Sequence, residues 1–307
     1  MSRGRNPSGL SGLVVIDKDL TWTSHDVVAK LRGLLGERRI GHAGTLDPAA
    51  TGLLLVGVGP ATRLLRYLQG SFKTYEGAIR FGATTDTLDA DGSVTQRFEM
   101  DGLCHRDVEE AASAMIGESL QVPPMVSALK VDGVRLHELA RQGIEIERVS
   151  RPITIESFEL RPSSDPMVWH FEVRCSSGTY VRSIADDLGR TLGGGAHLAR
   201  LRRTRNDRFS ADDAVTLGVL EQQLREGATP ASLVMSPLDM LGSLPLRLVD
   251  EITAASVVNG ASIAHEGDEP EGSLLRIVNS EGDLMGVYRR NGSTLRADVV
   301  LAKAASV

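Results

Sequence analysis

The chain has 307 residues, of which 41% are hydrophobic, 24% are charged and 4% are aromatic. This apolar share is enough for a packed core and excludes a largely disordered protein. A membrane helix needs roughly 18 apolar residues, and the best run, residues 53–59, ends at Pro60. Because residues 1–12 lack the apolar segment of a secretory signal, we expect a flexible tail at 1–11 on a cytoplasmic protein. Cys104 and Cys175 lie far apart and outside any ligand pattern, which argues against a disulfide framework and a zinc site.

The charge is unevenly distributed along the chain. The net charge of −6 argues against a protein that binds nucleic acid indiscriminately. Residues 1–85 carry 11 Lys and Arg against 6 Asp and Glu, residues 86–120 carry 2 against 9, and residues 200–210 carry five arginines against Asp207. Two basic blocks on an acidic chain fit a localised surface for an anionic ligand. Arginines that guard a solvated edge strand are the alternative.

The first part of the chain predicts short strands and helices in irregular order. Residues 12–17 predict a strand, and Ser24 is the expected cap of a helix that runs to about Leu35 and ends at Gly36. The further elements predicted before residue 120 are a loop at 37–52, a strand at 53–58, a helix at about 61–69, a strand at 73–81, an Asp-rich loop at 82–92 and a helix at 106–116.

The second part begins with a long connection at 123–151, and loops of that length in compact domains are usually functional. The elements predicted after it are strands at 152–160, 168–175 and 198–205 and helices at about 180–192 and 217–224. Prolines at 230, 237 and 245 mark a transition, and short strands follow at 274–278, 284–289 and 295–301. We therefore expect a domain boundary near residue 244. Because strands and helices do not alternate regularly, the pattern favours an α+β fold over a doubly wound sheet.

The strongest local signal is residues 41–52, with the sequence GHAGTLDPAATG. It lacks the Gly-Lys-Ser/Thr ending of a phosphate-binding loop. Asp47 followed by Pro48 is typical of the start of a helical turn, so from these two residues capping is favoured over catalysis. His42 is equally explained as a loop histidine. Without a second acid or base beside Asp47, the segment gives no local support to a paired-carboxylate glycosidase, and Ser-His-Asp and metal-ligand spacings are also missing.

Several segments nevertheless match one known family in order. They are RIGHAGTLDPAATG at 39–52, KTY at 73–75, the acidic loop at 85–92, PPMVSALK at 123–130, CSSGTYVR at 175–182 and GAHLARLRR at 195–203. Together they cover roughly residues 12–210 and closely resemble the TruB-type tRNA pseudouridine synthases, which modify uridine 55 in the T loop. Before the first helix that family commonly has Lys-Pro-x-Gly-x-Thr-Ser, whereas residues 18–24 read KDLTWTS, without the Pro and the Gly.

The resemblance implies roles for individual residues. Asp47 matches the nucleophile and Arg182 the arginine paired with it, since a guanidinium keeps a buried carboxylate ionised. Whether the carboxylate attacks the uracil ring or the ribose carbon stays open. The expected substrate-binding residues are His42, which fills the space vacated in the RNA, Tyr75, which stacks on the flipped base, Tyr180 and Leu201. The expected RNA phosphate contacts are Lys73, Lys130, Arg202 and Arg203.

The resemblance also implies an architecture. We expect a catalytic domain at 12–244 with a mixed, mainly antiparallel sheet flanked by helices, and a thumb insertion that grips RNA at 123–151. Residues 245–307 resemble a small, mainly-β PUA-type RNA-binding domain. Since the isomerisation exchanges neither electrons nor phosphate, no cofactor and no metal are implied.

The partner implied by the resemblance is the T arm of tRNA, bound by a monomer without an obligatory protein partner. Two alternatives remain. The chain could be a tRNA-binding factor that folds the T arm without using Asp47, or a pseudouridylase that depends on guide RNA and partner proteins.

Overall fold

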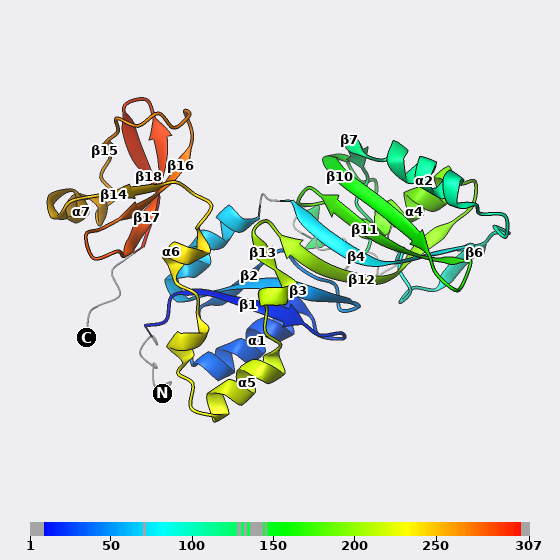
Figure 1. Ribbon diagram of the computed structural model, residues 1–307, viewed down its shortest axis with the longest axis horizontal. Helices are drawn as coiled ribbons and strands as arrows, with labels where there is room; N and C mark the ends of the chain where they lie inside the picture. Colours follow the sequence, from blue (N-terminus) through cyan, green and yellow to red (C-terminus); the bar gives the residue numbers. More distant parts are fainter. Residues whose placement is uncertain are drawn as a thin grey trace.

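The structure is a computed structural model that describes residues 9–69, 72–127, 130–131, 134–135, 144 and 146–301. Most of the expected tail at 1–11, and residues 128–129, 132–133, 136–143 and 145 of the expected thumb at 123–151, lie outside these ranges. A large sheet and a smaller C-terminal sheet dominate the described part (Figure 1). Among its helices, none is both long and apolar enough to cross a membrane.

The large sheet is mixed and mainly antiparallel. Its strands follow the order β1 (Gly12–Lys18), β3 (Ala50–Val58), β12 (Ala196–Asn206), β4 (Lys73–Phe81), β11 (Val168–Cys175), β10 (Arg151–Pro162) and β7 (Gly117–Gln121), while β2 (Ile40–Ala43) pairs with β3 and β13 (Phe209–Ser210) with β12. Strands β3 and β12 run parallel, with Leu201 opposite Ala50 and Arg203 opposite Gly52. This pairing carries the start of β3, just after Asp47, to the middle of the sheet.

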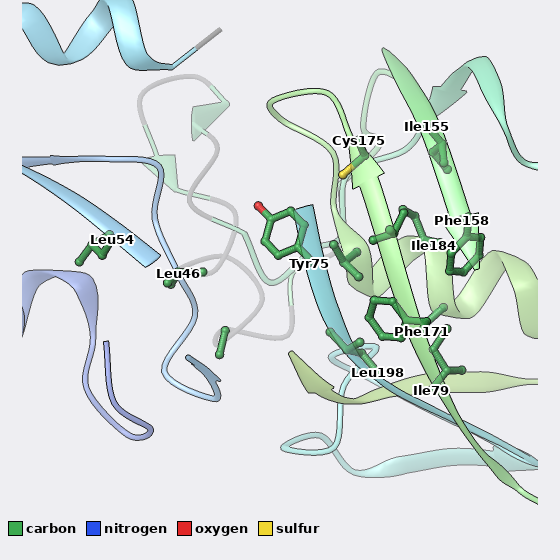
Figure 2. Packing of buried hydrophobic residues seen from close by; sticks show 14 of the residues in the cluster. Leu46, Leu54, Tyr75, Ile79, Ile155, Phe158, Phe171, Cys175, Ile184 and Leu198 are labelled. Atoms are coloured by element: carbon green, nitrogen blue, oxygen red, sulfur yellow. The ribbon is translucent and has the colours of Figure 1, made fainter. Parts of the chain in front are cut away.

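Helices pack on both halves of this sheet. They are α1 (Ser24–Leu35), α2 (His105–Ala114), α4 (Val181–Thr191), α5 (Leu217–Arg225), α6 (Pro237–Met240) and the 3₁₀ helices η1 (Gly59–Leu68), η2 (Ala211–Asp213) and η3 (Pro230–Leu233). In Figure 1, α1 and α5 lie by β1, whereas α2 and α4 lie toward β10 and β7. One core cluster joins the two halves, burying Leu31 of α1 and Leu188 of α4 against the sheet. Figure 2 shows Tyr75 at the margin of this core, with its hydroxyl directed away from the packed side chains.

Thr23, and not Ser24 as expected, caps α1. The Thr23 hydroxyl accepts the N–H of Asp26 at 3.0 Å, and the Asp26 carboxylate accepts the N–H of Thr23 at 2.9 Å. Ser24 is the first helical residue, and its buried hydroxyl bonds elsewhere. In the preceding turn, Thr21 stands where the family commonly has Gly and adopts a left-handed φ of 70°. The turn is therefore kept without glycine, at the cost of strain in a β-branched residue.

The segment 37–52 differs from the expected loop. Residues 40–43 form β2 and residue 50 begins β3, which leaves residues 37–39 and 44–49 irregular. Ala50 donates its N–H to the carbonyl of Asp47 at 3.0 Å, which closes a turn, and no helix begins at Pro48. A turn therefore begins at Asp47, as expected from Pro48, but it does not lead into a helix, and the Asp47 carboxylate pairs with Arg182. The helix expected at 61–69 is the 3₁₀ helix η1, which begins earlier, at Gly59.

The C-terminal sheet is small and antiparallel except at one edge. Its order is β14 (Leu246–Leu248), β16 (Leu274–Val278), β17 (Leu284–Asn291), β18 (Thr294–Val300) and β15 (Ile263–Ala264), with α7 (Glu251–Val257) beside it. Two short strand pairs complete the described part, β5 (Ala83–Thr85) with β6 (Val94–Arg97) and β8 (Lys130–Val131) with β9 (Val134–Arg135). The whole has the expected α+β class, a mixed sheet flanked by helices together with a small mainly-β, PUA-like unit.

The C-terminal sheet rests on η1. Asp298 of β18 accepts the hydroxyl of Tyr67 at 2.5 Å and pairs with Arg66, while Arg63 donates to the carbonyl of Val300 at 2.6 Å. Beneath these bonds one core cluster contains apolar side chains of both parts, including Leu64, Leu65 and Leu68 of η1 and Val287 and Val299 of the C-terminal sheet. The two sheets therefore share buried apolar surface.

Candidate active site

A hollow of about 460 Å³ opens where the segment before β3 meets β4, β12 and the start of α4. Its lining includes most of the residues expected from the sequence, namely His42, Asp47, Lys73, Tyr75, Tyr180, Arg182, Leu201 and Arg203. These residues lie up to 161 positions apart in the sequence (His42 to Arg203). The topology of the sheet thus places the separate motifs around one space.

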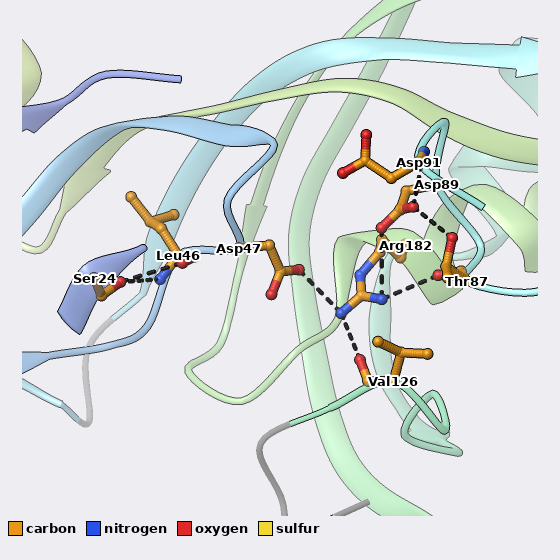
Figure 3. Close-up of polar contacts among 8 residues, drawn as sticks. All are labelled: Ser24, Leu46, Asp47, Thr87, Asp89, Asp91, Val126 and Arg182. Carbon is orange, nitrogen blue, oxygen red and sulfur yellow. Dashed lines mark hydrogen bonds and ion pairs between the residues drawn. The ribbon is translucent and has the colours of Figure 1, made fainter. Parts of the chain in front are cut away.

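An ion pair between Asp47 and Arg182 lies in this hollow, with Oδ2 and Nη2 2.9 Å apart (Figure 3). The guanidinium also donates to the carbonyls of Val126 at 2.8 Å and Thr87 at 3.0 Å, and it lies 3.6 Å from a carboxylate oxygen of Asp89. The Arg182 side chain is 6% exposed, whereas that of Asp47 is 47% exposed. The buried arginine is therefore held by partly buried acceptors and presents its charge to a carboxylate that remains open to solvent.

Lys18 supports the segment that carries Asp47. Its ammonium group donates to the carbonyls of Trp22 at 2.7 Å, Asp19 at 3.0 Å and Pro48 at 3.5 Å. Burial lowers the pKa of Lys18 to about 8, and the nearby carboxylates of Asp19 and Asp47 partly oppose this shift. The ammonium therefore remains mostly charged at neutral pH and joins the turn before α1 to the residue after Asp47.

Two further cations line the hollow. Arg203 is buried and donates to the carbonyls of Leu53 at 2.7 Å and Gly44 at 3.0 Å. Gly44 has a φ of 76°, and a Cβ there would lie 3.2 Å from an Arg203 nitrogen, so the loop uses glycine for this close approach. Lys73 donates to the Ser177 hydroxyl at 2.8 Å, and burial, followed by the nearby Arg203, lowers its pKa to about 8.

The aromatic side chains in the hollow are uncharged at neutral pH. Burial raises the pKa of both Tyr75 and Tyr180, so the phenols keep their protons. Burial lowers the pKa of His42, and the neighbouring His25 and Arg203 lower it further. The rings of His42 and His25 pack edge to face, with their centroids 5.6 Å apart. Tyr75 lies directly opposite Arg203 in the β4–β12 pair. The arrangement combines one carboxylate, several cations and neutral rings, a set suited to a polar aromatic group attached to an anionic chain.

Two expected residues are not part of this lining. Arg202 lines a separate hollow of about 640 Å³, which shares Leu201 with the first. Its guanidinium forms two hydrogen bonds, of 2.9 and 2.7 Å, with the carboxylate of Asp17. Lys130 belongs to β8, but its side chain lies outside the described residues.

The structure adds residues that sequence reasoning did not single out. Asp89 and the carbonyls of Thr87 and Val126 surround Arg182, and Ser177 bonds Lys73. The Asp-rich loop at 82–92 was a signal for Asp89, whereas backbone acceptors leave no signal in the sequence. Within the described ranges, no group of three His, Cys, Asp or Glu side chains could hold a metal ion.

Comparisons with known proteins identify the family of this chain. Residues 32–181 match the N-terminal domain of TruB family pseudouridylate synthases, and residues 182–241 match the C-terminal domain described for tRNA pseudouridylate synthase B. The tRNA pseudouridine synthase B of Leifsonia xyli subsp. xyli is 41% identical over 93% of this chain and 95% of its own length. The tRNA pseudouridine synthase B of Mycobacteroides abscessus is 39% identical over 97% of this chain and 99% of its own length.

A solved structure shares the fold. The crystal structure of a Cbf5-Nop10-Gar1 complex contains a chain that matches with a TM-score of 0.73 at 24% identity, over 94% of this chain and 84% of that chain. The matched sequence domains together span residues 32–241, more than half of the chain. The protein described here belongs to the TruB family of pseudouridylate synthases.

Proposed function

We propose that this protein isomerises uridine to pseudouridine at position 55, in the T loop of tRNA, and that Asp47 is the nucleophile. The observation that carries the proposal is the Asp47–Arg182 ion pair, in which a half-exposed carboxylate faces the same hollow as Tyr75. The family, and relatives named tRNA pseudouridine synthase B, support tRNA as the substrate. A tRNA substrate also fits a cytoplasmic enzyme.

The reaction breaks the bond between N1 of uracil and C1′ of ribose, turns the base and joins C5 to C1′. The proton on C5 leaves and N1 gains one, so atoms and electrons balance without an oxidant. A carboxylate can form a transient covalent bond and leave again, which divides one difficult step into easier ones. Arg182 supports this role of Asp47, because a guanidinium 2.9 Å away stabilises the ionised carboxylate.

The target base must leave the stack of the T loop to reach Asp47. The neutral ring of Tyr75 would stack on the flipped uracil, Leu201 and Tyr180 would border it, and His42 would fill the space left in the RNA. The charges of Lys73 and Arg203 draw the anionic backbone toward the hollow. Lys130 and Arg202 are further proposed phosphate contacts, Arg202 from the second hollow.

We propose that the protein acts as a monomer and without a protein partner, with a catalytic domain at 12–244 and a PUA-like domain at 245–307 that contacts RNA. Modification of an isolated T-arm RNA by the purified protein would support this. A requirement for guide RNA or an added protein would contradict it.

The test of the nucleophile is Asp47→Asn. We expect this variant to form no pseudouridine in a T-arm transcript, measured by chemical mapping, while its Kd for tRNA stays within a few-fold. The matched control is Asp19→Asn, which changes an exposed carboxylate near the same turn and should keep full activity. Full activity of Asp47→Asn would defeat the proposal. If Asp47→Asn also folds tRNA as well as the parent, a T-arm folding activity exists that does not use the carboxylate.

A further inference from the structure

A buried polar side chain holds the backbone before each of the two ion-pair residues. Asp47 has no regular secondary structure of its own and is half exposed, so packing alone does not fix its carboxylate. Arg182 lies in the first turn of α4, and Tyr180, the N-cap residue before this helix, makes no side-chain capping bond. The position of each partner therefore depends on what holds the neighbouring backbone.

Ser24 holds the backbone before Asp47. Its hydroxyl accepts the N–H of Leu46 at 3.0 Å and donates to the carbonyl of the same residue at 3.2 Å, as Figure 3 shows. Ser24 is 1% exposed and lies at the start of α1, which is anchored in the core by Val27 and Leu31. One hydroxyl thus ties both polar groups of Leu46 to a rigid helix.

Gln121 holds the backbone before Arg182 in the same way. Its carboxamide oxygen accepts the N–H of Tyr180 at 2.8 Å, and its nitrogen donates to the Tyr180 carbonyl at 3.2 Å. Gln121 is 5% exposed and is the last residue of β7, which is paired with β10 in the large sheet. The carboxamide therefore fixes the entry of α4 from a neighbouring strand, two residues before Arg182.

We propose that Ser24 and Gln121 are positioning residues for the isomerisation, acting through Leu46 and Tyr180 on the Asp47–Arg182 pair. This inference rests on the proposed function of Asp47. Neither side chain lines the hollow, so neither touches the substrate there. Their effect is on geometry, and a displacement of about 1 Å at a reacting group can lower a rate by as much as about 100-fold.

The test compares single-turnover rate constants and Kd values on T-arm RNA for Ser24→Ala and Gln121→Met, both at a temperature where denaturation curves show folded protein. We expect each rate constant to fall by about 10- to 100-fold, with Kd nearly unchanged. Gln121→Glu keeps an acceptor for the Tyr180 N–H but sets a second buried oxygen against the Tyr180 carbonyl, so its rate should be as low as that of Gln121→Met or lower.

The matched controls remove a hydroxyl and a carboxamide that form no bond with either segment. Thr23→Val removes the capping box of α1, and Gln222→Met removes a surface bond to Glu226. Both should keep the parent rate, although Thr23→Val lowers the denaturation midpoint. The inference is overturned if Ser24→Ala and Gln121→Met lose no more rate than these controls, or if the loss is in Kd. An active Asp47→Asn would instead overturn the proposed function itself.

Discussion

Replacing Arg182 should destabilise the protein far more than replacing Asp47, although the two form one ion pair. Arg182→Met leaves the carbonyls of Thr87 and Val126 without this donor and Asp89 without its counter-charge. An unpaired buried acceptor costs about 1–3 kcal/mol, and breaking a buried pair from one side costs about 3–5 kcal/mol. We expect the free energy of unfolding to fall by about 3–5 kcal/mol. Since the Asp47 side chain is 47% exposed, Asp47→Asn should change it by less than about 1 kcal/mol.

Urea denaturation followed by circular dichroism, with linear extrapolation and comparison of m values, measures both changes. Arg106→Met on α2 is the control, because Arg106 is 81% exposed and pairs with Glu110, which is 70% exposed. It should lower the free energy of unfolding by less than about 1 kcal/mol. The reasoning is refuted if Arg182→Met costs no more than Arg106→Met, or if Asp47→Asn is as destabilising as Arg182→Met.

Three further predictions follow from strain, charge and docking. Thr21→Gly relieves a left-handed φ and should raise the free energy of unfolding by about 0.5–1 kcal/mol in urea, after the added entropy of the unfolded chain; no gain would mean that the turn is unstrained. Lys73 loses its charge as the pH rises through about 8. The Kd of the parent for T-arm RNA should therefore increase between about pH 7 and 9, and the Kd of Lys73→Met should change less over the same range. In the unfolded chain Lys73 has its ordinary pKa of 10.5, so above about pH 8 it binds more protons than in the folded protein. The free energy of unfolding of the parent should therefore rise from about pH 8 to 10.5, and that of Lys73→Met should rise less. Equal pH dependence of the two proteins would contradict the lowered pKa of Lys73. Asp298→Ala removes the acceptor for Tyr67 and should lower the free energy of unfolding by about 1 kcal/mol, whereas an unchanged midpoint would show that apolar contacts alone dock the C-terminal sheet.

Long, regular patterns predicted the fold well. The expected strands at 73–81 and 168–175 agree with β4 (Lys73–Phe81) and β11 (Val168–Cys175) to the residue. Both are eight or nine residues long, and turn residues bound them closely, so local sequence is sufficient. The helix expected at 217–224 likewise differs from α5 (Leu217–Arg225) by one residue.

Local sequence could not decide features set by distant partners. Thr23 and Ser24 are both good capping residues, and the choice depends on Leu46, which takes the Ser24 hydroxyl from 22 residues away. The bonds between Gln121 and Tyr180 span 59 residues and leave no local pattern. Strand β2 is only four residues long and forms because β3, which follows it, offers a partner.

The basic run at 200–208 shows the same limit within one strand. The motifs placed this segment at the site, but successive side chains of a strand point to opposite faces. Arg203 accordingly lies opposite Tyr75 in the hollow, while Arg202 lies opposite Glu76 and pairs with Asp17. Register shifts between Leu198 and Arg200 and between Arg203 and Arg205 add to this division. A cluster of charges in the sequence is thus not one surface in the protein.

The contact between the C-terminal sheet and η1 affects how the activity of truncated variants of this enzyme can be interpreted. Leu64, Leu65 and Leu68 share a core cluster with Val287 and Val299 of that sheet, and Gln69, directly after η1, lines the hollow. A chain cut near residue 244 would lose the C-terminal part of this cluster and the bonds of Arg63, Arg66 and Tyr67, which would loosen the helix that leads into β4. Loss of activity on such deletion would therefore report damage transmitted to the catalytic centre as well as lost grip on tRNA, and point substitutions on the outer strands are the cleaner way to separate the two.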